Sequence, residues 1–511
     1  VYWASVEEVQ RTHIYDEEFD DILSDESNPG HHDDYRSFYI LNNNGKDRMM
    51  FGNDGGPALV RDGLNTDPTI SSLNGDLSIN LIHAFHLHEP TKRIAYGLQD
   101  HAMRFKDDDT TYSDPFIWEG SAAMIQDRYP NGIVGENAYN DIKDIVDYGY
   151  NTGIPFTSPN PIVDSNFADE RLALGAYFVN YRHYPERFAR GVRKYEDDGF
   201  YNGGVALNRA KNVSEVSEID SSLSIGAVAI CQRNPNYIYA AEFNIREGQG
   251  NSLHKLYRSD DDGQTWDNLV LSTVALDDST YNLSQQLEWK GIRAIAVDHT
   301  DSSIVYCGIG QTHDVDDVIT DERFRVIKST DFGDSFNDYS EGLPALPVER
   351  LLTVESDENL IFCATSVGIY YRTDTMSQWK CFSENLPMVE VTGMQYDYCA
   401  NELYVSTYGR GMWKTPVPFN ISSSYQTEIT GTEIWNDFKI LKEDLVIKDG
   451  GVLTITDTVK VAYDKKIIVE PGGRLNIDGG VLTNYCNDFW HGIEVWGDHN
   501  ADQTLANQGY L

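Results

Sequence analysis

The sequence predicts an all-β protein, built as a multi-bladed β-propeller of about eight blades (range seven to ten) followed by the first rungs of a right-handed parallel β-helix. Three observations predict this fold class. Helical periodicity is almost absent, and short apolar runs bounded by Asp, Asn, Gly and Pro recur along the 511 residues. Strand-rich units repeat in the middle of the chain, and a shorter repeat follows Pro418.

The central repeat is the clearest. Four segments that start at Ile225, Ile292, Leu351 and Val391 each read as a strand, a polar turn, a second strand and a further strand. Three or four antiparallel strands per unit are typical of a propeller blade. Weaker copies of the unit occur upstream, over residues 35–58, 82–105, 118–150 and 172–205, and residues 1–15 resemble the closing strands of an earlier blade.

Two octapeptides within these units share the pattern S-x-D-x-G-x-[ST]-[WF]. The pattern residues are Ser259, Asp261, Gly263, Thr265 and Trp266 in one copy, and Ser329, Asp331, Gly333, Ser335 and Phe336 in the other. The pattern suits a hairpin turn, because the Asp side chain accepts backbone N–H groups and the Gly takes a positive φ. The final aromatic residue is expected to plug the blade. Residues 372–379 form a degenerate copy without the Gly. We therefore predict a structural role for these residues.

The composition changes after Pro418, where a Ser/Thr-rich stretch leads into a different repeat. Ile447 and Val469, Gly450 and Gly472, and Leu453 and Leu475 are each separated by 22 residues. A repeat of this length with paired glycines at its corners is typical of one β-helix rung, and equivalent residues should stack inward. We predict a propeller over residues 1–418, a linker over 419–433 and the start of the β-helix over 434–511. We also expect chain missing before residue 1 and further rungs beyond residue 511.

These motifs resemble those of the sortilin-like and xyloglucanase-like propellers. The resemblance rests on the two octapeptides, which match the Asp-box motif of these proteins. It also rests on G-N-D-G-G at 52–56, on G-L-Q-D at 97–100 and on T-Y-G-R-G-M-W at 407–413. The tail, with V-E-P-G-G at 469–473 and W-H-G-I-E-V-W at 490–496, is similar to β-helix regions of large bacterial proteins exported by the type IX system. The resemblance implies a protein secreted to the medium or to the cell surface of a bacterium.

The charge balance excludes one class of partner. Lys and Arg number 40 against 81 Asp and Glu, giving a net charge of −41. A surface of this charge repels nucleic acid and anionic membranes. No run of 18 apolar residues occurs, so we expect no transmembrane segment.

The six cysteines lack any C-x-x-C spacing and predict neither a zinc site nor a redox motif. Cys307 and Cys363 lie in apolar strand runs and are expected to be buried thiols. A bridge between Cys381 and Cys399 is one possible pairing.

Catalysis is the alternative to binding. A glycosidase needs two carboxylates facing one cleft. In xyloglucanase-like relatives an Asp lies near a Gly-Gly turn, which makes Asp54 and Asp100 the candidates here. Both sit in motifs that non-enzymatic relatives also carry. Our first hypothesis is therefore an adhesin-like propeller that binds extracellular polysaccharide or a cell-surface protein and assembles with other secreted surface proteins. The alternative is a polysaccharide hydrolase of the xyloglucanase-like type.

The metal candidates are acidic clusters. Calcium favours carboxylate oxygens, and the candidates for its ligands are Asp107, Asp109, Asp314, Asp316 and Asp317. None of these clusters matches an EF-hand loop, and we expect no cofactor to be required. His83, His86 and His88 could instead hold a transition metal, but a structural role for them is the better prediction.

Overall fold

In the computed structural model every regular element that the structure describes is a β-strand. The residues described are 2–4, 9–11, 20–23, 35–43, 46–53, 56–61, 69–73, 80–98, 103–107, 110–113, 120–125, 132–137, 148–149, 179–180, 188–193, 203–210, 213–220, 225–242, 256–269, 274–276, 279–281, 290–299, 301–311, 324–383, 385–418, 424–504 and 506–511. This part of the chain contains no helix long and apolar enough to span a membrane. The chain divides into two compact units, one of residues 1–81 with 407–411 and one of 82–406 with 412–511.

The first unit contains two antiparallel sheets. Their strands are β1 (Tyr2–Ala4), β2 (Val9–Arg11), β3 (Asp20–Leu23), β4 (Tyr35–Asn43), β5 (Lys46–Asn53), β6 (Gly56–Arg61) and β7 (Thr69–Ser72), paired in chain order. The G-N-D-G-G motif joins β5 to β6, with Asn53 opposite Gly56. Gly56 has a φ of 103°, a conformation that favours glycine.

The second unit carries the propeller. Within the described residues, seven sheets follow one another along the chain from Ile82 to Pro416, and they are antiparallel except where Val274 and Ala275 pair in parallel with Phe336 and Asn337. Their strands are β8 (Ile82–His88), β9 (Arg93–Leu98), β10 (Met103–Asp107), β11 (Thr110–Ser113), β12 (Gly120–Ile125), β13 (Gly132–Asn137), β14 (Tyr148–Gly149), β15 (Val179–Asn180), β16 (Phe188–Arg193), β17 (Gly203–Ala210), β18 (Val213–Asp220), β19 (Ile225–Ile230), β20 (Ile238–Glu242), β21 (Leu256–Ser259), β22 (Asp267–Leu269), β23 (Val274–Leu276), β24 (Ser279–Tyr281), β25 (Lys290–Val297), β26 (Val305–Gln311), β27 (Val326–Ser329), β28 (Phe336–Asp338), β29 (Val348–Val354), β30 (Leu360–Thr365), β31 (Gly368–Arg372), β32 (Lys380–Cys381), β33 (Val391–Asp397), β34 (Glu402–Thr407) and β35 (Met412–Pro416).

The blade of residues 348–381 buries its second strand. The second strand of one clear blade, β30, is buried at every position, whereas the outermost strand of the same blade, β32, is exposed. Apolar side chains of neighbouring blades then pack together, as in the cluster formed by Leu360, Phe362, Val391 and Leu403. This burial explains why the sequence repeat follows short apolar runs. The blade and propeller prediction is confirmed.

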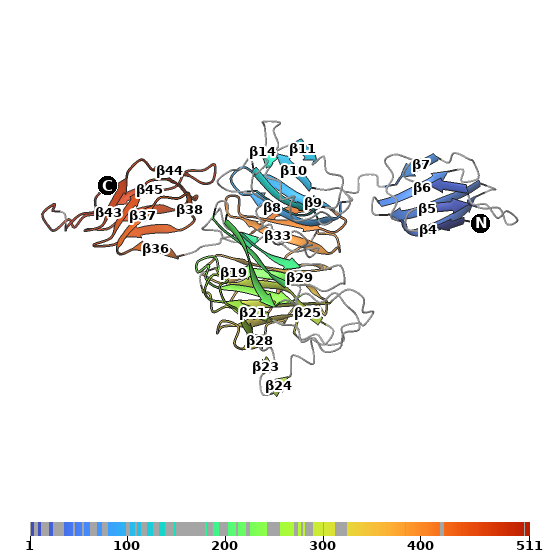
Figure 1. Ribbon diagram of the computed structural model, residues 1–511, viewed down its shortest axis with the longest axis horizontal. Coiled ribbons are helices and arrows are strands. Elements are labelled where there is room, and N and C mark those ends of the chain that lie inside the picture. The colour runs from blue at the N-terminus through green and yellow to red at the C-terminus, as the bar shows by residue number, and fades with distance from the viewer. Residues whose placement is uncertain are drawn as a thin grey trace. The chain divides into compact units, whose positions relative to one another are not determined.

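The first and last blades of this unit meet edge to edge. β8 and β33 lie side by side in Figure 1. The amide of Gln395 on β33 makes two hydrogen bonds of 2.8 Å to Leu87 on β8, accepting from its N–H and donating to its C=O. Leu87, Ile94 and Tyr404 add a shared apolar cluster. The pairing joins strands 308 residues apart in the chain.

The two octapeptide turns have the same hydrogen bonds. In the first, the Ser259 hydroxyl accepts the Gly263 N–H at 2.7 Å, and the Asp261 carboxylate accepts the Thr265 N–H at 2.8 Å. In the second, Ser329 accepts from Gly333 at 2.8 Å and Asp331 from Ser335 at 2.9 Å. Both glycines have positive φ, 78° and 88°.

The aromatic residue that ends each octapeptide is buried to a different degree. Phe336 is 3% exposed and Trp379 of the degenerate copy is 2% exposed, whereas Trp266 is only half-buried. In the degenerate copy Asp374 binds Lys328 at 2.7 Å instead of holding its own turn. The aromatic residue therefore packs into the blade even where the polar turn is lost.

The C-terminal segment is a parallel β-solenoid of three rungs and the first strand of a fourth. Its strands are β36 (Gln426–Ile429), β37 (Thr432–Trp435), β38 (Lys439–Leu441), β39 (Asp444–Ile447), β40 (Val452–Ile455), β41 (Thr458–Val461), β42 (Lys466–Val469), β43 (Arg474–Ile477), β44 (Val481–Asn484) and β45 (Gly492–Val495). They form three parallel sheets, in the orders β36-β39-β42-β45, β37-β40-β43 and β38-β41-β44. The first rung begins at Gln426, inside the stretch predicted as a linker.

The rungs stack as the repeat predicts. Ile447 lies opposite Val469 and Leu453 opposite Leu475, and all four side chains are fully buried. The paired glycines have distinct roles in this stack. Gly450 has a φ of 79°, and a Cβ on Gly451 would lie 2.2 Å from the carbonyl oxygen of Ile429 in the rung before. Only glycine therefore allows the corner to turn and the rungs to approach.

Candidate functional site

The candidate site is a cavity of about 330 Å³ between the inner strands of the propeller. Five inner strands contribute to its lining, β8, β19, β25, β29 and β33. A cavity of this size is at the lower end of the range for small-ligand sites, and such sites combine an apolar wall with a few polar groups. The channel of the propeller is therefore the place where the described residues offer a ligand both room and chemistry.

The apolar wall comes from small and aromatic residues. Gly226, Ala227 and Val228 of β19 line one part, and Phe85 and Met394 line another. Gly393 allows the Phe85 ring to approach, because a Cβ at residue 393 would lie 3.0 Å from the ring. An aromatic ring in the wall provides a surface for the apolar face of a ligand.

Two arginines on neighbouring blades contribute the main polar groups. Arg350 on β29 donates from Nε to the Thr392 carbonyl at 2.8 Å and from Nη1 to the Glu349 carbonyl at 2.5 Å. Arg293 on β25 binds the carboxylate of Glu349 at 2.9 Å and that of Glu390 at 2.5 Å. These contacts fix the planes of both guanidinium groups before any ligand arrives.

Burial shifts the pKa values of Glu349 and Arg350. It raises the pKa of Glu349 from 4.5 to about 7, against the opposing attraction of Arg293. It also lowers the pKa of Arg350 to about 10, which leaves that guanidinium charged at neutral pH. Arg350 is therefore a charged group of the lining at neutral pH, and Glu349, which contacts the lining residue Arg293, is a carboxyl group that titrates near neutrality.

The solenoid contributes to the same cavity. Lys442, just after β38, and Tyr485, just after β44, belong to its lining. Lys442 binds Glu89 at 3.1 Å, and both side chains are almost fully buried. Glu89 follows β8 directly, so these solenoid residues lie at the end of the cavity where the inner strand β8 finishes. One end of the channel is therefore built from two domains.

A disulfide and buried ion pairs hold this junction. Cys399, in the turn between β33 and β34 of the last blade, is bonded to Cys486 of the solenoid, with their Cα atoms 5.5 Å apart. Arg233 binds Glu355 of the propeller at 2.6 Å and Glu443 of the solenoid at 3.0 Å. Breaking one partner of such a buried pair leaves an uncompensated charge, which makes the junction resist separation.

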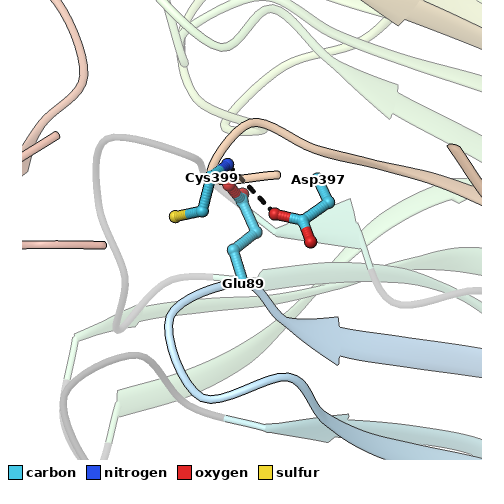
Figure 2. A group of neighbouring side chains, drawn as sticks. All are labelled: Glu89, Asp397 and Cys399. Carbon is cyan, nitrogen blue, oxygen red and sulfur yellow. Dashed lines mark hydrogen bonds between the residues drawn. The ribbon is translucent and has the colours of Figure 1, made fainter. Parts of the chain in front are cut away.

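Glu89, Asp397 and Cys399 bring three side chains of metal-binding types together at the junction, two with carboxylate oxygens and one with sulfur. Their ligand atoms all lie within 4.8 Å of one another, and Figure 2 shows the Glu89 carboxylate directed toward Cys399 beside Asp397. Asp397 accepts the Cys399 N–H at 3.0 Å and binds Lys92. Because the Cys399 sulfur is in the disulfide and each carboxylate binds a lysine, the three side chains act as junction contacts, not as a ligand set.

The structure does not describe the side chains of the residues predicted to bind calcium or to catalyse hydrolysis. Asp107 ends strand β10, and its side chain is not among those described. Asp54, Asp100, Asp109, Asp314, Asp316 and Asp317 lie outside the described residues. The calcium and glycosidase hypotheses at these positions stay predictions.

The histidines of β8 separate. His86 lines the cavity, whereas His88 is 1% exposed and its Nδ1 lies 2.6 Å from the Thr91 hydroxyl. Burial lowers the pKa of His88 to about 3, so this side chain is neutral at physiological pH.

The cysteine analysis was right in part. Cys307 and Cys363 are buried free thiols as predicted. The Cys381–Cys399 pairing is wrong, because Cys399 is bonded to Cys486 and Cys381 is free and exposed. The bridge spans 87 residues and joins two domains, which no local spacing could reveal.

Sequence reasoning also missed the two cavity arginines. The available signal was a charged residue inside an otherwise apolar inner strand, in G-I-R-A-I at 291–295 and V-E-R-L-L at 348–352. A charge in such a strand is costly unless it faces a polar cavity or a partner.

Comparison with known proteins finds propellers among solved structures. The chain is similar to the Dos1 propeller, at 11% identity and a TM-score of 0.44 over 74% of this chain and 90% of that one. It is also similar to the GH74 enzyme of Niastella koreensis, at 11% identity and a TM-score of 0.36 over 79% and 73%. A third likeness is to the GH74 xyloglucanase of Xanthomonas campestris, at 11% identity and a TM-score of 0.28 over 70% and 68%. No family model and no curated protein matches the chain.

Proposed function

We propose that the chain is a secreted, adhesin-like protein of a bacterial cell surface. In this proposal the propeller binds extracellular polysaccharide or a surface protein, and the solenoid presents the propeller. The observation that carries this proposal is the junction. A disulfide between Cys399 and Cys486 belongs to an oxidising compartment, and it holds the two domains as one structural body.

The cavity favours binding over hydrolysis. Hydrolysis by the usual glycosidase mechanism needs two carboxyl groups flanking one bond. Among the described residues that line the cavity, Glu89 is the one carboxylate, and it is ion-paired with Lys442 at 3.1 Å. A single carboxylate held by a lysine suits a structural role. The polar and aromatic lining is then available for recognition.

A binding and turnover assay tests the proposal. The purified chain is applied to glycan arrays and to bacterial surface-protein fractions, and the same preparation is incubated with soluble polysaccharides while reducing ends are counted. We expect retention of a glycan or a surface protein without release of new reducing ends.

The outcome against the proposal is equally specific. Rapid turnover of a polysaccharide that Asp54→Ala or Asp100→Ala abolishes would establish the hydrolase alternative instead. Turnover unchanged by both substitutions would remove these two residues as the catalytic pair. Failure to retain any glycan or protein would overturn the binding function.

A further inference from the structure

A second and smaller cavity, of about 250 Å³, lies at the first rung of the solenoid, where that rung meets the propeller. Gln232 and Arg233, which follow the propeller strand β19, form one part of its lining. The other lining residues lie between Tyr425 and Glu443, at the start of the solenoid. The volume is just below the range of ordinary small-ligand sites, so this junction cavity suits a ligand the size of one ring.

The first rung turns polar side chains toward the solenoid core where the next rung turns apolar ones. Residues that lie opposite each other in neighbouring strands share one face of the sheet. At three positions, one in each sheet, the first rung has a polar residue opposite a fully buried apolar one. These pairs are Thr427 and Leu445, Glu433 and Leu453, and Lys439 and Val459. All three polar residues line the junction cavity, so the apolar core ends there in a polar chamber.

The charges of this lining cancel. Among its described residues, Arg233 and Lys439 are the cations, and Glu433 and Glu443 are the carboxylates. Arg233 binds Glu443 at 3.0 Å, and the Glu433 carboxylate accepts the indole N–H of Trp435 at 3.1 Å. An ion that entered would find no surplus of the opposite charge, and burying it there would be costly. The lining therefore favours a neutral ligand that carries hydroxyl groups.

Tyr425 provides an aromatic ring whose plane is fixed. The guanidinium of Arg233 lies over one face of this ring, 3.3 Å from its centroid. Salt bridges of Arg233 to Glu355, at 2.6 Å, and to Glu443 hold that guanidinium in place. The Tyr425 residue is still 41% exposed, so its exposed surface lies on the other face and on the edge of the ring. A fixed ring with one open face can stack on the apolar face of a sugar.

We propose that the junction cavity binds one pyranose ring of a neutral polysaccharide, stacked on Tyr425. The hydroxyl groups of the sugar then meet the polar residues of the first rung. The carboxylate of Glu433 accepts hydrogen bonds from them, and the ammonium group of Lys439 donates. This inference rests on the proposed binding function, and it adds to that function a place and a class of saccharide.

The test is a saturation-transfer NMR titration of the full chain with the methyl pyranosides of D-glucose, D-galactose and D-mannose. We expect at least one of them to bind with a Kd on the order of 1 mM, because one stacked ring and a few hydrogen bonds supply little more. D-Sorbitol, which has the hydroxyl groups but no ring, should bind more weakly by about tenfold. D-Galacturonate should also bind more weakly, because its charge finds no surplus opposite charge in the cavity.

Variants assign the binding to residues. Tyr425→Ala should weaken binding of the best pyranoside by about tenfold, whereas Tyr425→Phe should keep most of it, because the ring remains. Glu433→Leu gives the first rung the residue that the second has at Leu453, so the chain should fold and yet bind about tenfold more weakly. Tyr463→Ala is the matched control, since Tyr463 is also an exposed solenoid tyrosine, at 52%, and lies outside the lining.

Each contrary result has a separate meaning. If none of the three pyranosides binds, or if folded Tyr425→Ala binds as the unaltered chain does, the junction cavity is not a saccharide site. Equal affinity for sorbitol overturns the stacking, and equal affinity for galacturonate overturns the neutral class. If Tyr425→Ala does not fold, Glu433→Leu decides. Polysaccharide retention on arrays that Tyr425→Ala leaves unchanged removes this site and leaves the proposed function standing, whereas no retention of any glycan or surface protein overturns that function.

Discussion

The propeller and the solenoid build all-β structure in opposite ways. In a blade, consecutive strands pair antiparallel, and residues meet across hairpins, as Phe362 meets Leu352 on one side and Tyr371 on the other. In the solenoid, each strand pairs in parallel with the strand one rung later, so Ile447 meets Val469. Strand pairing in the solenoid therefore depends on the period of the sequence repeat, whereas strand pairing in a blade depends on the turns that join consecutive strands.

The two regions also differ in how far their contacts reach. Every rung touches only its neighbours, which is the general property of solenoids. The propeller closes on itself through Gln395 and Leu87, across 308 residues. Damage should stay local in the solenoid and spread around the ring in the propeller. The predictions below test this contrast.

The largest effect should come from cutting the bridge between the two regions. Replacing both Cys399 and Cys486 by serine opens a loop of 87 residues, which in the chain-entropy model costs about 4 kcal/mol of stability. We expect chemical denaturation to split into two transitions, with the solenoid unfolding first. Cys381→Ser is the control, because that exposed thiol is free. A double variant with a single unchanged transition would refute the role of the bridge.

A cavity in the solenoid core should have the next largest effect. Leu453→Ala removes a fully buried side chain that stacks on Leu475, and should cost about 3 kcal/mol. In the variant that lacks the Cys399–Cys486 bridge, the loss should appear only in the solenoid transition of the denaturation curve. Val481→Ala on the neighbouring sheet is the control, since that side chain is 52% exposed. An equal loss of stability in both transitions would contradict local damage.

A smaller effect is expected from Glu349, and it depends on pH. Because burial raises its pKa from 4.5 to about 7, the folded chain holds a proton there that the unfolded chain has already lost. Stability that is complete below pH 4.5 is therefore lost as pH rises toward 7. In Glu349→Gln, the fall in unfolding free energy between pH 5 and pH 7.5 should be smaller by about 2 kcal/mol.

Denaturation at several pH values measures this difference. Glu358→Gln, at an exposed position, is the comparison variant and should follow the unaltered chain. If Glu349→Gln also keeps the full pH dependence, Glu349 does not titrate in this window.

The smallest effect should come from the octapeptide turns. Asp331→Ala removes the acceptor for the Ser335 N–H and hydroxyl and should cost about 1.5 kcal/mol in the propeller transition of the variant that lacks the Cys399–Cys486 bridge. Although burial opposes it, hydrogen bonds from Ser335 and Ser329 lower the pKa of Asp331. Asp374→Ala in the degenerate copy is the matched control and should change stability by less than about 0.5 kcal/mol. Equal losses would mean that Asp331 is not a structural acceptor.

How much could be predicted from the sequence differs between the two regions. The last two complete rungs were recognisable because their residues recur 22 positions apart, as Leu453 and Leu475 do. The first rung was assigned to a linker because its spacing differs, since Gln426 lies opposite Asp444 only 18 positions on. The first rung also lacks the pair of glycines that the later rungs have. A period is visible only where it repeats.

The candidate site could not be predicted by spacing at all. Arg293, Arg350 and Gln395 come from different blades, and Lys442 comes from the solenoid. Nothing along the chain relates these positions, because closure of the ring brings them together. The motif residues that could be singled out, such as Asp261 and Asp331, serve their own turns. The local motifs therefore predicted local turns, whereas the residues of the cavity could be identified only from the three-dimensional fold.

The contact between Gln395 and Leu87 also delays closure of the propeller during synthesis of the chain. Leu87 leaves the ribosome long before Gln395 exists, since 308 residues separate them. At typical rates of translation the first of these blades waits roughly 15 to 60 s for its partner. During that interval the edge of β8 has no final neighbour and can pair with another nascent chain. Slowing or crowding of translation should therefore raise misassembly at this seam before it affects any other blade.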